Sequence, residues 1–385
     1  MISRGHSDGP VDNTIAEIST PERQHARQIF SVKFTSPKIY LRRIYTTMRQ
    51  PPALAPESLI ACLRTYYDLD VISVRFLPIG YDPYAFVYEA MTAEATSYFV
   101  KIRKGAINPS SLLVPRVLIE QGIPNILAPL RTRTQALWCA LEAYTVVVFP
   151  FIRGDNAMNL GLSDSQWREF GATLGAIHAG DFAERLQGQV PTETFSLPSA
   201  ALVRRLSSQI PHARFDSPAA TRLAAFWKEN AARIENILAR AETLGRKLQS
   251  QPFQNVLCHA DIHAANILVS TEDRIYLVDW DGPLLAPRER DLLFIVGSTI
   301  ARTVEPHEEA LFFQGYGDPI DVNMSALTYY RYERAIEDIG EFGKSVFLNT
   351  EQSETEKEDE VRLLTQLFDP GQIIESAMQA DPNHA

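Results

Sequence analysis

Polar side chains follow an apolar strand in the C-terminal half of the chain. Asp261 and Asn266 lie in the loop after the apolar run Val256–Cys258, a second short strand follows, and a third apolar run ends at Asp279. Asn266 and Asp279 supply the hard oxygen ligands that Mg²⁺ accepts together with phosphate oxygens. Asp261 stands five residues before Asn266, across the same loop, where it can accept the proton of a substrate hydroxyl. This spacing predicts phosphoryl transfer.

The same residues have an alternative explanation as turn residues that cap buried strands. That explanation suits a single Asp, but several polar residues at these offsets between apolar strands favour a catalytic loop. His259 is a candidate catalytic residue beside Asp261. However, we expect the imidazoles of His259 and His263 to form hydrogen bonds within the loop rather than to exchange protons in catalysis. Asp291 is expected to anchor the loop through backbone N–H groups rather than to touch a ligand.

A lysine lies inside an apolar strand in the N-terminal part of the chain. Lys101 belongs to the run Tyr98–Ile102, where strand alternation places its side chain in line with Phe99. A lysine in such a strand needs a partner, or else it extends from a strand edge into water. The segment from Ile102 to Ile119 contains no glutamate, and Glu120 stands at the end of the expected helix. The sequence therefore leaves the acidic partner of Lys101 open.

The elements that position Lys101 are expected to form a small sheet. Alternating apolar runs predict an antiparallel meander of about five strands with one helix packed against it. Two helices are also expected in this part of the chain, and Gly122 is a suitable residue to end the second of them. The expected helices are 57–67 and 110–121, and the expected strands are 71–77, 85–90, 97–102, 126–130, 137–141 and 144–149.

The elements around Asp261 are expected to be mainly helical. Ser163 and Gln166 have the spacing of a capping box ahead of a helix over 167–178. An alanine-rich segment predicts one long helix over 218–248, and a further helix is expected over 327–342. The chain thus reads as an α+β, two-lobed protein with Pro150 at the junction. We expect an extension outside the fold at 1–47, a nucleotide-binding lobe with its hinge at 48–152, and a catalytic and substrate-binding lobe at 153–385.

The loop signature resembles that of a known enzyme superfamily. His259-x-Asp261-x-x-x-x-Asn266 followed by Asp279 resembles the catalytic signature of the aminoglycoside phosphotransferase and choline kinase superfamily. The longer strings 258–266, 278–292 and 329–338 are most similar to spectinomycin phosphotransferases. The resemblance covers roughly Pro56 to the C-terminus. It implies a bilobal protein-kinase-like fold and the use of ATP or GTP with Mg²⁺, which Asn266 and Asp279 would bind.

The resemblance also implies roles for residues of the first lobe. Lys101 corresponds to the strand lysine that holds the α- and β-phosphates. Gly80 lies between the first two strands, where kinases carry a loop over the phosphates, although a plain hairpin turn explains it as well. Phe149, Pro150 and Ile152 correspond to the hinge, where the Pro150 carbonyl and the Ile152 N–H would bind adenine. An ordinary buried strand that ends at a proline explains the hinge residues about equally well.

The acceptor is expected to bind near acidic side chains. Glu333, Glu337 and Glu341 follow one another at intervals of four residues and so share one helix face. They either receive the ammonium groups of an aminocyclitol or form a solvated face with Arg331 and Arg334 interleaved. The candidate acceptor-binding residues are Asp281, Tyr330, Glu333 and Glu337.

Composition and charge limit the classes of partner. The chain has 385 residues and a formal net charge of −10, which speaks against a nucleic-acid-binding protein and permits a small cationic substrate. Residues 1–47 carry a net charge of +3, so the other 338 residues carry −13. These first residues lack a signal-peptide pattern, and one hypothesis is that translation starts at Met48.

Cysteine content and apolar runs indicate the compartment. Three widely spaced cysteines, Cys62, Cys139 and Cys258, predict neither a disulfide framework nor a zinc site, which favours a cytoplasmic location. No apolar run approaches the roughly 18 residues that a membrane-spanning helix needs, so no membrane partner is expected. The oligomeric state, monomer or dimer, is left open.

The sequence therefore predicts an O-phosphotransferase that transfers the γ-phosphoryl group to a hydroxyl of a small cationic polyol. A spectinomycin-like aminocyclitol or an aminoglycoside antibiotic is the preferred acceptor, which would make the enzyme an antibiotic-resistance kinase. Choline, amino sugars or homoserine-type alcohols are alternatives in the same reaction class. A catalytically silent kinase-like nucleotide-binding protein is the alternative of a different class.

Overall fold

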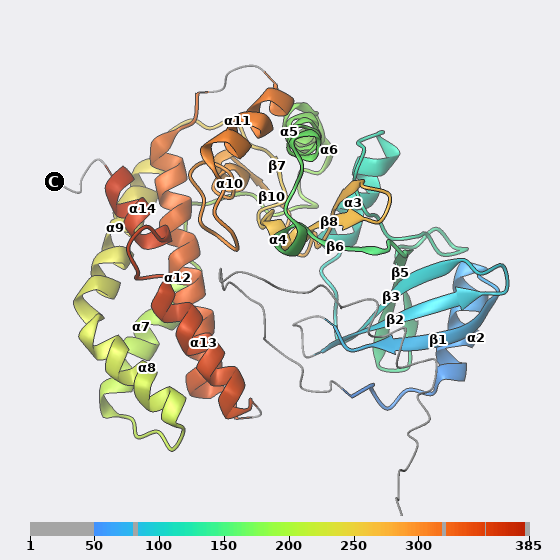
Figure 1. The fold of residues 1–385 in the computed structure, drawn as a ribbon, viewed down its shortest axis with the longest axis horizontal. Coiled ribbons are helices and arrows are strands. Elements are labelled where there is room, and N and C mark those ends of the chain that lie inside the picture. The colour runs from blue at the N-terminus through green and yellow to red at the C-terminus, as the bar shows by residue number, and fades with distance from the viewer. Residues whose placement is uncertain (1–49, 80–83, 318–320, 351, 382–385) are drawn as a thin grey trace, which may run out of the picture. The chain divides into compact units, whose positions relative to one another are not determined.

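Five antiparallel strands form the first part of the protein in a computed structural model that describes residues 50–79, 84–317, 321–350 and 352–381. All described residues belong to one compact unit. The strand order is β1-β2-β3-β5-β4, and every neighbouring pair is antiparallel (Figure 1). The extension 1–47, Met48 and Gly80 lie outside the described residues. The strands are β1 (Val71–Leu77), β2 (Ala85–Thr92), β3 (Ser97–Lys104), β4 (Cys139–Leu141) and β5 (Tyr144–Pro150).

The two faces of this sheet differ. One face packs its buried valines and isoleucines, among them Val100 and Val148, against helix α2 (Pro56–Tyr67). On the other face, the register places Lys101 between Val87 of β2 and Val147 of β5. Successive side chains of a strand point to opposite faces, so Phe99 shares the face of Lys101, as the sequence predicted.

One prediction for this part of the chain is wrong. Residues 126–130 form no strand: Ile126 makes a single bridge to Leu277. The helix that covers the sheet is α2, whereas Val114 and Leu118 of α3 (Ser110–Glu120) are buried in the core of the helical region. Gly122 follows α3 with φ +81°, a left-handed conformation that glycine adopts without strain, as expected.

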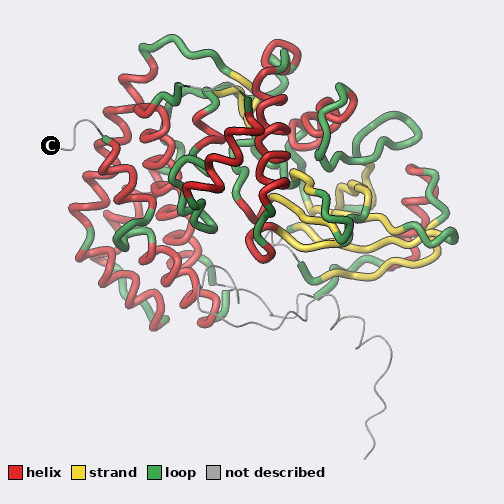
Figure 2. The backbone as a smooth tube through the Cα atoms, turned by 45° about the horizontal axis from the view of Figure 1, so that its top comes forward, coloured by secondary structure: helices red, strands yellow, loops and turns green. Residues whose placement is uncertain are grey.

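Helices make up most of the remaining chain (Figure 2). The capping box of Ser163 and Gln166 is present at the start of α5 (Asp164–Ala179), as predicted. Three short strands, β6 (Gly154–Asn156), β8 (Ile267–Ser270) and β9 (Ile275–Leu277), form one small sheet, and β7 (Val256–Cys258) pairs with β10 (Leu284–Ala286). The helices are α4 (Ala157–Leu160), α5 (Asp164–Ala179), α6 (Phe182–Arg185), α7 (Ala200–Gln209), α8 (Pro218–Glu229), α9 (Ala231–Gln249), α10 (Glu289–Leu292), α11 (Pro306–Tyr316), α12 (Met324–Leu348), α13 (Glu354–Gln366) and α14 (Ile373–Ala380), with 3₁₀ turns η1 (Ile210–His212) and η2 (Ala264–Asn266).

The predicted long helix over 218–248 is two helices, α8 and α9. Asn230 separates them with φ −97° and ψ 10°. Its side-chain amide donates to the Phe226 carbonyl at 3.0 Å, and such side-chain bonds compete with the helical backbone pattern. The break lets both helices pack with α12 in a second core of the helical region, shown at the left of Figure 1.

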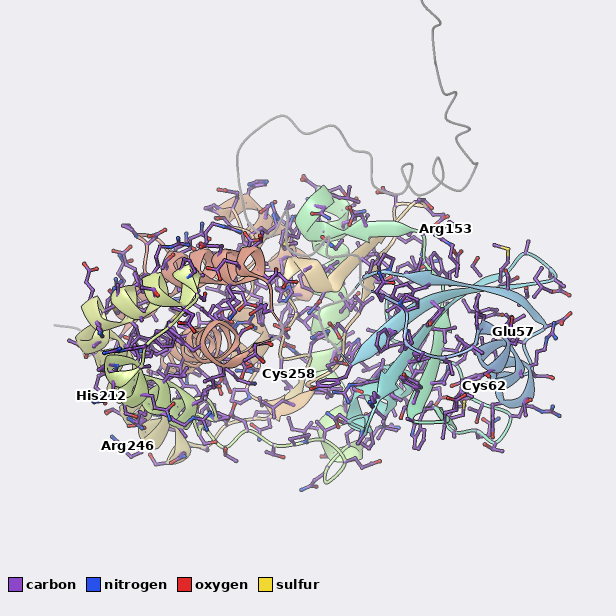
Figure 3. The ribbon with its side chains drawn as sticks, turned by 90° about the horizontal axis from the view of Figure 1, so that it is seen from below. Glu57, Cys62, Arg153, His212, Arg246 and Cys258 are labelled. Atoms are coloured by element: carbon purple, nitrogen blue, oxygen red, sulfur yellow. The ribbon has the colours of Figure 1, made fainter. Side chains whose placement is uncertain are left out.

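The fold brings two distant cysteines together. Cys62 on α2 and Cys139 on β4 are 77 residues apart in sequence, yet their Sγ atoms lie 3.4 Å apart. All three cysteines are free thiols, and Cys258 lies separately on β7 (Figure 3). Within the described part of the chain, every helix is too short or too polar to cross a lipid bilayer.

Candidate active site

The carboxylate of Asp291 fixes the start of the candidate catalytic loop. Its Oδ2 accepts the His259 N–H at 2.9 Å, and its Oδ1 accepts the Ala260 N–H at 2.7 Å. His178 Nε2 lies 3.0 Å from the same Oδ2. Burial acts to raise the pKa of the Asp291 carboxyl, but the hydrogen bond and charge of His178 outweigh it and hold the pKa below its usual range. Asp291 is thus the loop anchor that the sequence suggested.

This anchor also explains a grouping of potential metal ligands. His178, Cys258 and Asp291 are buried with their ligand atoms within 4.8 Å of one another. However, both oxygens of Asp291 already accept N–H groups of the loop. His178 in turn bonds Tyr316 through Nδ1 at 2.6 Å. These side chains satisfy one another, so the grouping is a structural network.

The His259 ring is fully buried and holds the loop from inside. Its Nδ1 accepts the Asp261 N–H at 3.3 Å, so Nε2 carries the hydrogen that it donates to the Val278 carbonyl at 2.9 Å. The ring packs on Trp280 with centroids 4.4 Å apart. Both ring nitrogens are occupied by the backbone, which favours the structural role over proton transfer.

Asp261 presents its carboxylate at the surface of the loop. Oδ1 accepts a hydrogen bond from Arg334 Nη1 at 2.7 Å, and Oδ2 lies 3.5 Å from both His263 Nε2 and Asn266 Nδ2. Burial acts to raise the pKa of the Asp261 carboxyl, but the hydrogen bond from His263 and the charge of Arg334 outweigh it, so the pKa lies below its usual range. Asp261 is therefore an anion ready to accept a hydrogen bond.

Asn266 and Asp279 carry the oxygens that could hold a metal ion. Asn266 Nδ2 donates to the Asp261 carbonyl at 2.8 Å, which directs its Oδ1 away from that bond. Asp279 is exposed with φ +64°, and no other described residue bonds its carboxylate. Desolvation and the charge of Asp281 raise the pKa of the Asp279 carboxyl. An unbonded carboxylate beside other acids, with an oriented amide oxygen, fits a hard divalent cation.

Lys101 meets an acidic partner from the other side of the site. Its Nζ lies 3.5 Å from Asp281 Oδ2, and Asn108 Nδ2 donates to the Asp281 carbonyl at 3.2 Å. Glu120 instead bonds Arg116 and Arg131 at the end of α3. Asp281, which we considered for the acceptor, is thus the carboxylate that pairs with Lys101, and this placement does not support acceptor binding.

The hinge residues lie at the end of β5 on the Lys101 side of the sheet. Phe149 and Phe99 pack edge to face with centroids 6.3 Å apart. Pro150 is exposed and Ile152 half-buried. Within the described ranges, the Ile152 N–H makes no hydrogen bond. The segment therefore offers an open backbone donor just after the end of β5.

The acidic helix face is divided by the fold. Glu333 pairs with Arg290, and burial raises the pKa of Glu333 to about 7 although the Arg290 charge opposes it. Glu337 lines the same pocket as these two side chains, together with Leu197–Ser199 of the segment before α7. Glu341 is apart from them and pairs with Lys344.

The structure does not support Tyr330 as an acceptor-binding residue. Its side chain is fully buried in the core and packs against Phe195. The guanidinium of Arg290 lies 5.4 Å from the centre of its ring. Helical periodicity placed Tyr330 beside the acidic residues, but α12 buries this side against the rest of the helical region.

Two basic residues make contacts in the candidate site that were not predicted from the sequence. Arg334 was considered only as part of a solvated face, yet it bonds Asp261, 73 residues earlier. Its spacing of four residues from Asp338, which also bonds it at 3.2 Å, was the one local signal that it is held in place. No comparable local pattern indicated that Arg290, next to the anchor Asp291, pairs with Glu333.

The chain is similar to known phosphotransferases. Residues 73–330 match the model of the phosphotransferase enzyme family. Protein StrN of Streptomyces griseus is 26% identical over 235 residues, 58% of this chain and 69% of that protein. The structure of spectinomycin phosphotransferase APH(9)-Ia in complex with ADP and spectinomycin is 33% identical with a TM-score of 0.76, over 85% of this chain and 99% of that one.

More distant structures share the fold alone. Choline kinase LicA from Streptococcus pneumoniae is 15% identical with a TM-score of 0.51, over 83% of this chain and 98% of that one. The kinase-like α+β fold, with its antiparallel first region and helical second region, is thereby confirmed. The chain belongs to the phosphotransferase enzyme family, whose reaction class, phosphoryl transfer to an alcohol group, is the one that the loop signature predicted.

Proposed function

We propose that this protein transfers the γ-phosphoryl group of ATP to a hydroxyl of a spectinomycin-like aminocyclitol. The contact between Lys101 and Asp281 at 3.5 Å carries the proposal. It brings Lys101 of strand β3 next to Asp281, which lies two residues after the metal-ligand candidate Asp279. The nucleotide and metal candidates therefore face one site. The identity of 33% with spectinomycin phosphotransferase over nearly its full length supports the acceptor class.

The nucleotide would lie on the Lys101 face of the sheet. The open N–H of Ile152 and the carbonyl of Pro150 supply one donor and one acceptor, the pair that an adenine edge needs. Lys101 would exchange its exposed contact with Asp281 for the α- and β-phosphates. Structures of spectinomycin phosphotransferase APH(9)-Ia in complex with ADP and with AMP support a purine nucleotide as the donor.

Asn266 and Asp279 would hold Mg²⁺ through their side-chain oxygens. When bound, the ion supplies positive charge that stabilises the phosphate oxygens during transfer. The residues fit this role because the Asn266 amide is oriented by the Asp261 carbonyl and because the Asp279 carboxylate is exposed. The chain's own contribution is to fix these oxygens on a loop that Asp291 anchors.

Asp261 would orient the acceptor hydroxyl and take its proton. The oxygen of that hydroxyl attacks the γ-phosphorus, the bond from phosphorus to the bridging oxygen breaks, and ADP leaves. The low pKa of Asp261 keeps it ionised, so its main effect is to position the nucleophile. Glu337 lines a pocket beside Glu333, and no other described residue pairs with its carboxylate. It is therefore the candidate for binding an ammonium group of the acceptor.

The test is turnover by the full chain with Mg²⁺ and ATP or GTP. The acceptor panel contains spectinomycin, an aminoglycoside, choline, ethanolamine and homoserine, with nucleoside diphosphate release and the mass of the phosphorylated product as readouts. We expect phosphorylated spectinomycin from the wild type and turnover slower by on the order of 10²–10⁴-fold from Asp261→Asn. Phosphorylation of only an amino alcohol would contradict the acceptor class. Nucleotide binding without turnover of any acceptor would favour a silent binding protein.

A further inference from the structure

The carboxylate of Asp261 is held by one short hydrogen bond. Arg334 Nη1 donates to Oδ1 at 2.7 Å, whereas the donors nearest to Oδ2, on His263 and Asn266, are both 3.5 Å away. The backbone of Asp261 is fixed separately by His259 and Asn266. Those backbone contacts do not restrict rotation about the side-chain bonds of Asp261. The hydrogen bond from Arg334 therefore sets the orientation of the carboxylate.

Arg334 is itself held from its own helix. Its Nε donates to Asp338, one turn further along α12, at 3.2 Å. Its guanidinium lies 6.0 Å from the centre of the Phe294 ring, and its side chain is 22% exposed. Two bonds to different nitrogens of the planar guanidinium fix its plane. A chain of contacts therefore runs from Asp338 through Arg334 to Asp261.

We propose that Arg334 is a positioning residue for phosphoryl transfer, which fixes Asp261 through Oδ1 so that Oδ2 meets the acceptor hydroxyl. Asp338 supports this role by holding Arg334. The proposal rests on the proposed function, because it needs Asp261 to orient a nucleophile. It adds the residue that orients Asp261 and the oxygen that remains available.

The geometry favours positioning over blocking. The Asp261 side chain is 45% exposed although Arg334 is bound to it, so an acceptor can reach the carboxylate without displacing the guanidinium. Oδ2 has only long contacts, which leaves it able to accept a short hydrogen bond. Arg334 also lies between Glu333 and Glu337 on α12. The hydrogen bond between Arg334 and Asp261 therefore ties α12, which carries both glutamates of the pocket, to the carboxylate that takes the proton.

The experiment compares Arg334→Met, Arg334→Lys and Asp338→Asn in the full chain, with Lys344→Met as a control on the exposed part of the same helix. We expect Arg334→Met to lower kcat about 10- to 100-fold, as misplacement of a reacting group does. The Kd for Mg²⁺-ATP should change less than about threefold, because Arg334 bonds Asp261 and Asp338 rather than Lys101. Arg334→Lys should recover part of kcat, and Asp338→Asn should cost less than Arg334→Met.

A double variant separates positioning from a general structural effect. With Asp261→Asn already present, Arg334→Met should lower kcat less than about twofold further, because residues that act as a unit are not additive. Equal losses in both backgrounds would overturn the proposal. A rise in kcat on Arg334→Met alone would also overturn it, since that result identifies Arg334 as a blocking group. Thermal unfolding of each variant checks that the fold is retained.

The test remains decisive if the proposed acceptor fails. A wild type that hydrolyses ATP slowly with water, and phosphorylates no acceptor, contradicts the proposed function. In that case water takes the place of the hydroxyl, and the same comparison of single and double variants is made on the hydrolysis rate. Non-additive loss with Asp261→Asn supports the role of Arg334 there too, and additive loss contradicts it.

Discussion

The anchor around Asp291 and the charged cluster around Asp279 belong to the same candidate site but are built in opposite ways. Asp291 is fully buried, and both of its oxygens accept hydrogen bonds from the loop. Asp279 is exposed, and no other described residue bonds its carboxylate. The nearby contact of Lys101 with Asp281 is 3.5 Å long, and the Asp281 side chain is 70% exposed.

This difference shows which charges the fold uses and which it leaves for ligands. A buried carboxylate is stable only when its partners are fixed, so Asp291 holds the loop whether or not a substrate is present. An exposed pair contributes little to stability. Lys101 and Asp281 can therefore exchange their contact, and the Asp279 carboxylate is open, when the proposed nucleotide and cation bind.

The largest expected effect comes from breaking the anchor. Asp291→Ala should lower the free energy of unfolding by about 3–5 kcal/mol, as removal of one partner from a buried charged network does. Chemical denaturation measures it. The matched control is Asp281→Ala, which removes an exposed carboxylate and should cost less than about 1 kcal/mol. Equal losses in the two variants would contradict the contrast between the regions.

The pH dependence of stability sharpens the same contrast. The pKa of Asp291 is lowered in the folded state, so its contribution is complete above the unfolded pKa of about 3.9 and is lost as the pH falls through the folded value. The difference in unfolding free energy between the wild type and Asp291→Asn should therefore shrink as denaturation is measured at lower pH. A constant difference down to the acid limit of folding would contradict this assignment.

The next effect concerns the region left for ligands. Asp279→Ala should weaken Mg²⁺-dependent nucleotide binding by on the order of 100-fold, because it removes the proposed metal ligand. Titration calorimetry with ATP measures it in the presence and absence of Mg²⁺. The fold should be unaffected, since no other described residue bonds this carboxylate. Unchanged Mg²⁺-dependent affinity would exclude Asp279 as a ligand.

The smallest effect is expected in the acidic pocket. The pKa of Glu333 is raised to about 7, so its carboxylate gains charge as the pH rises through neutrality and should then attract the ammonium group of the acceptor more strongly. The acceptor KM should fall roughly tenfold between about pH 6 and pH 8. In Glu333→Gln the KM should stay nearly flat. The same slope in both proteins would exclude Glu333 as its source.

The parts that were predictable from sequence are those with local signals. Asp261 and Asn266 lie in one loop, and Asp279 follows the two short strands β8 and β9 that come directly after it. The face of Lys101 follows from the alternation of side chains along β3, and the start of α5 follows from its capping box. Each of these patterns depends on residues that are near one another in the sequence, so tertiary packing does not alter it.

The parts that were missed depend on contacts between distant segments. Arg334 reaches Asp261 across 73 residues, and Cys62 meets Cys139 across 77. Tyr330 lies beside acidic residues in sequence, yet tertiary packing buries it. The break at Asn230 interrupts an otherwise good helical segment, and both resulting helices pack against α12. Such features require the packed structure.

The central claim is that Asp261 performs the transfer while other residues bind the nucleotide. The most direct test measures kcat and the Kd for Mg²⁺-ATP in the wild type and in Asp261→Asn, with spectinomycin as acceptor. We predict a loss of on the order of 10²–10⁴-fold in kcat, the usual range for a group that takes a proton during the reaction, with the Kd changed less than about threefold. Wild-type turnover by Asp261→Asn would contradict the account.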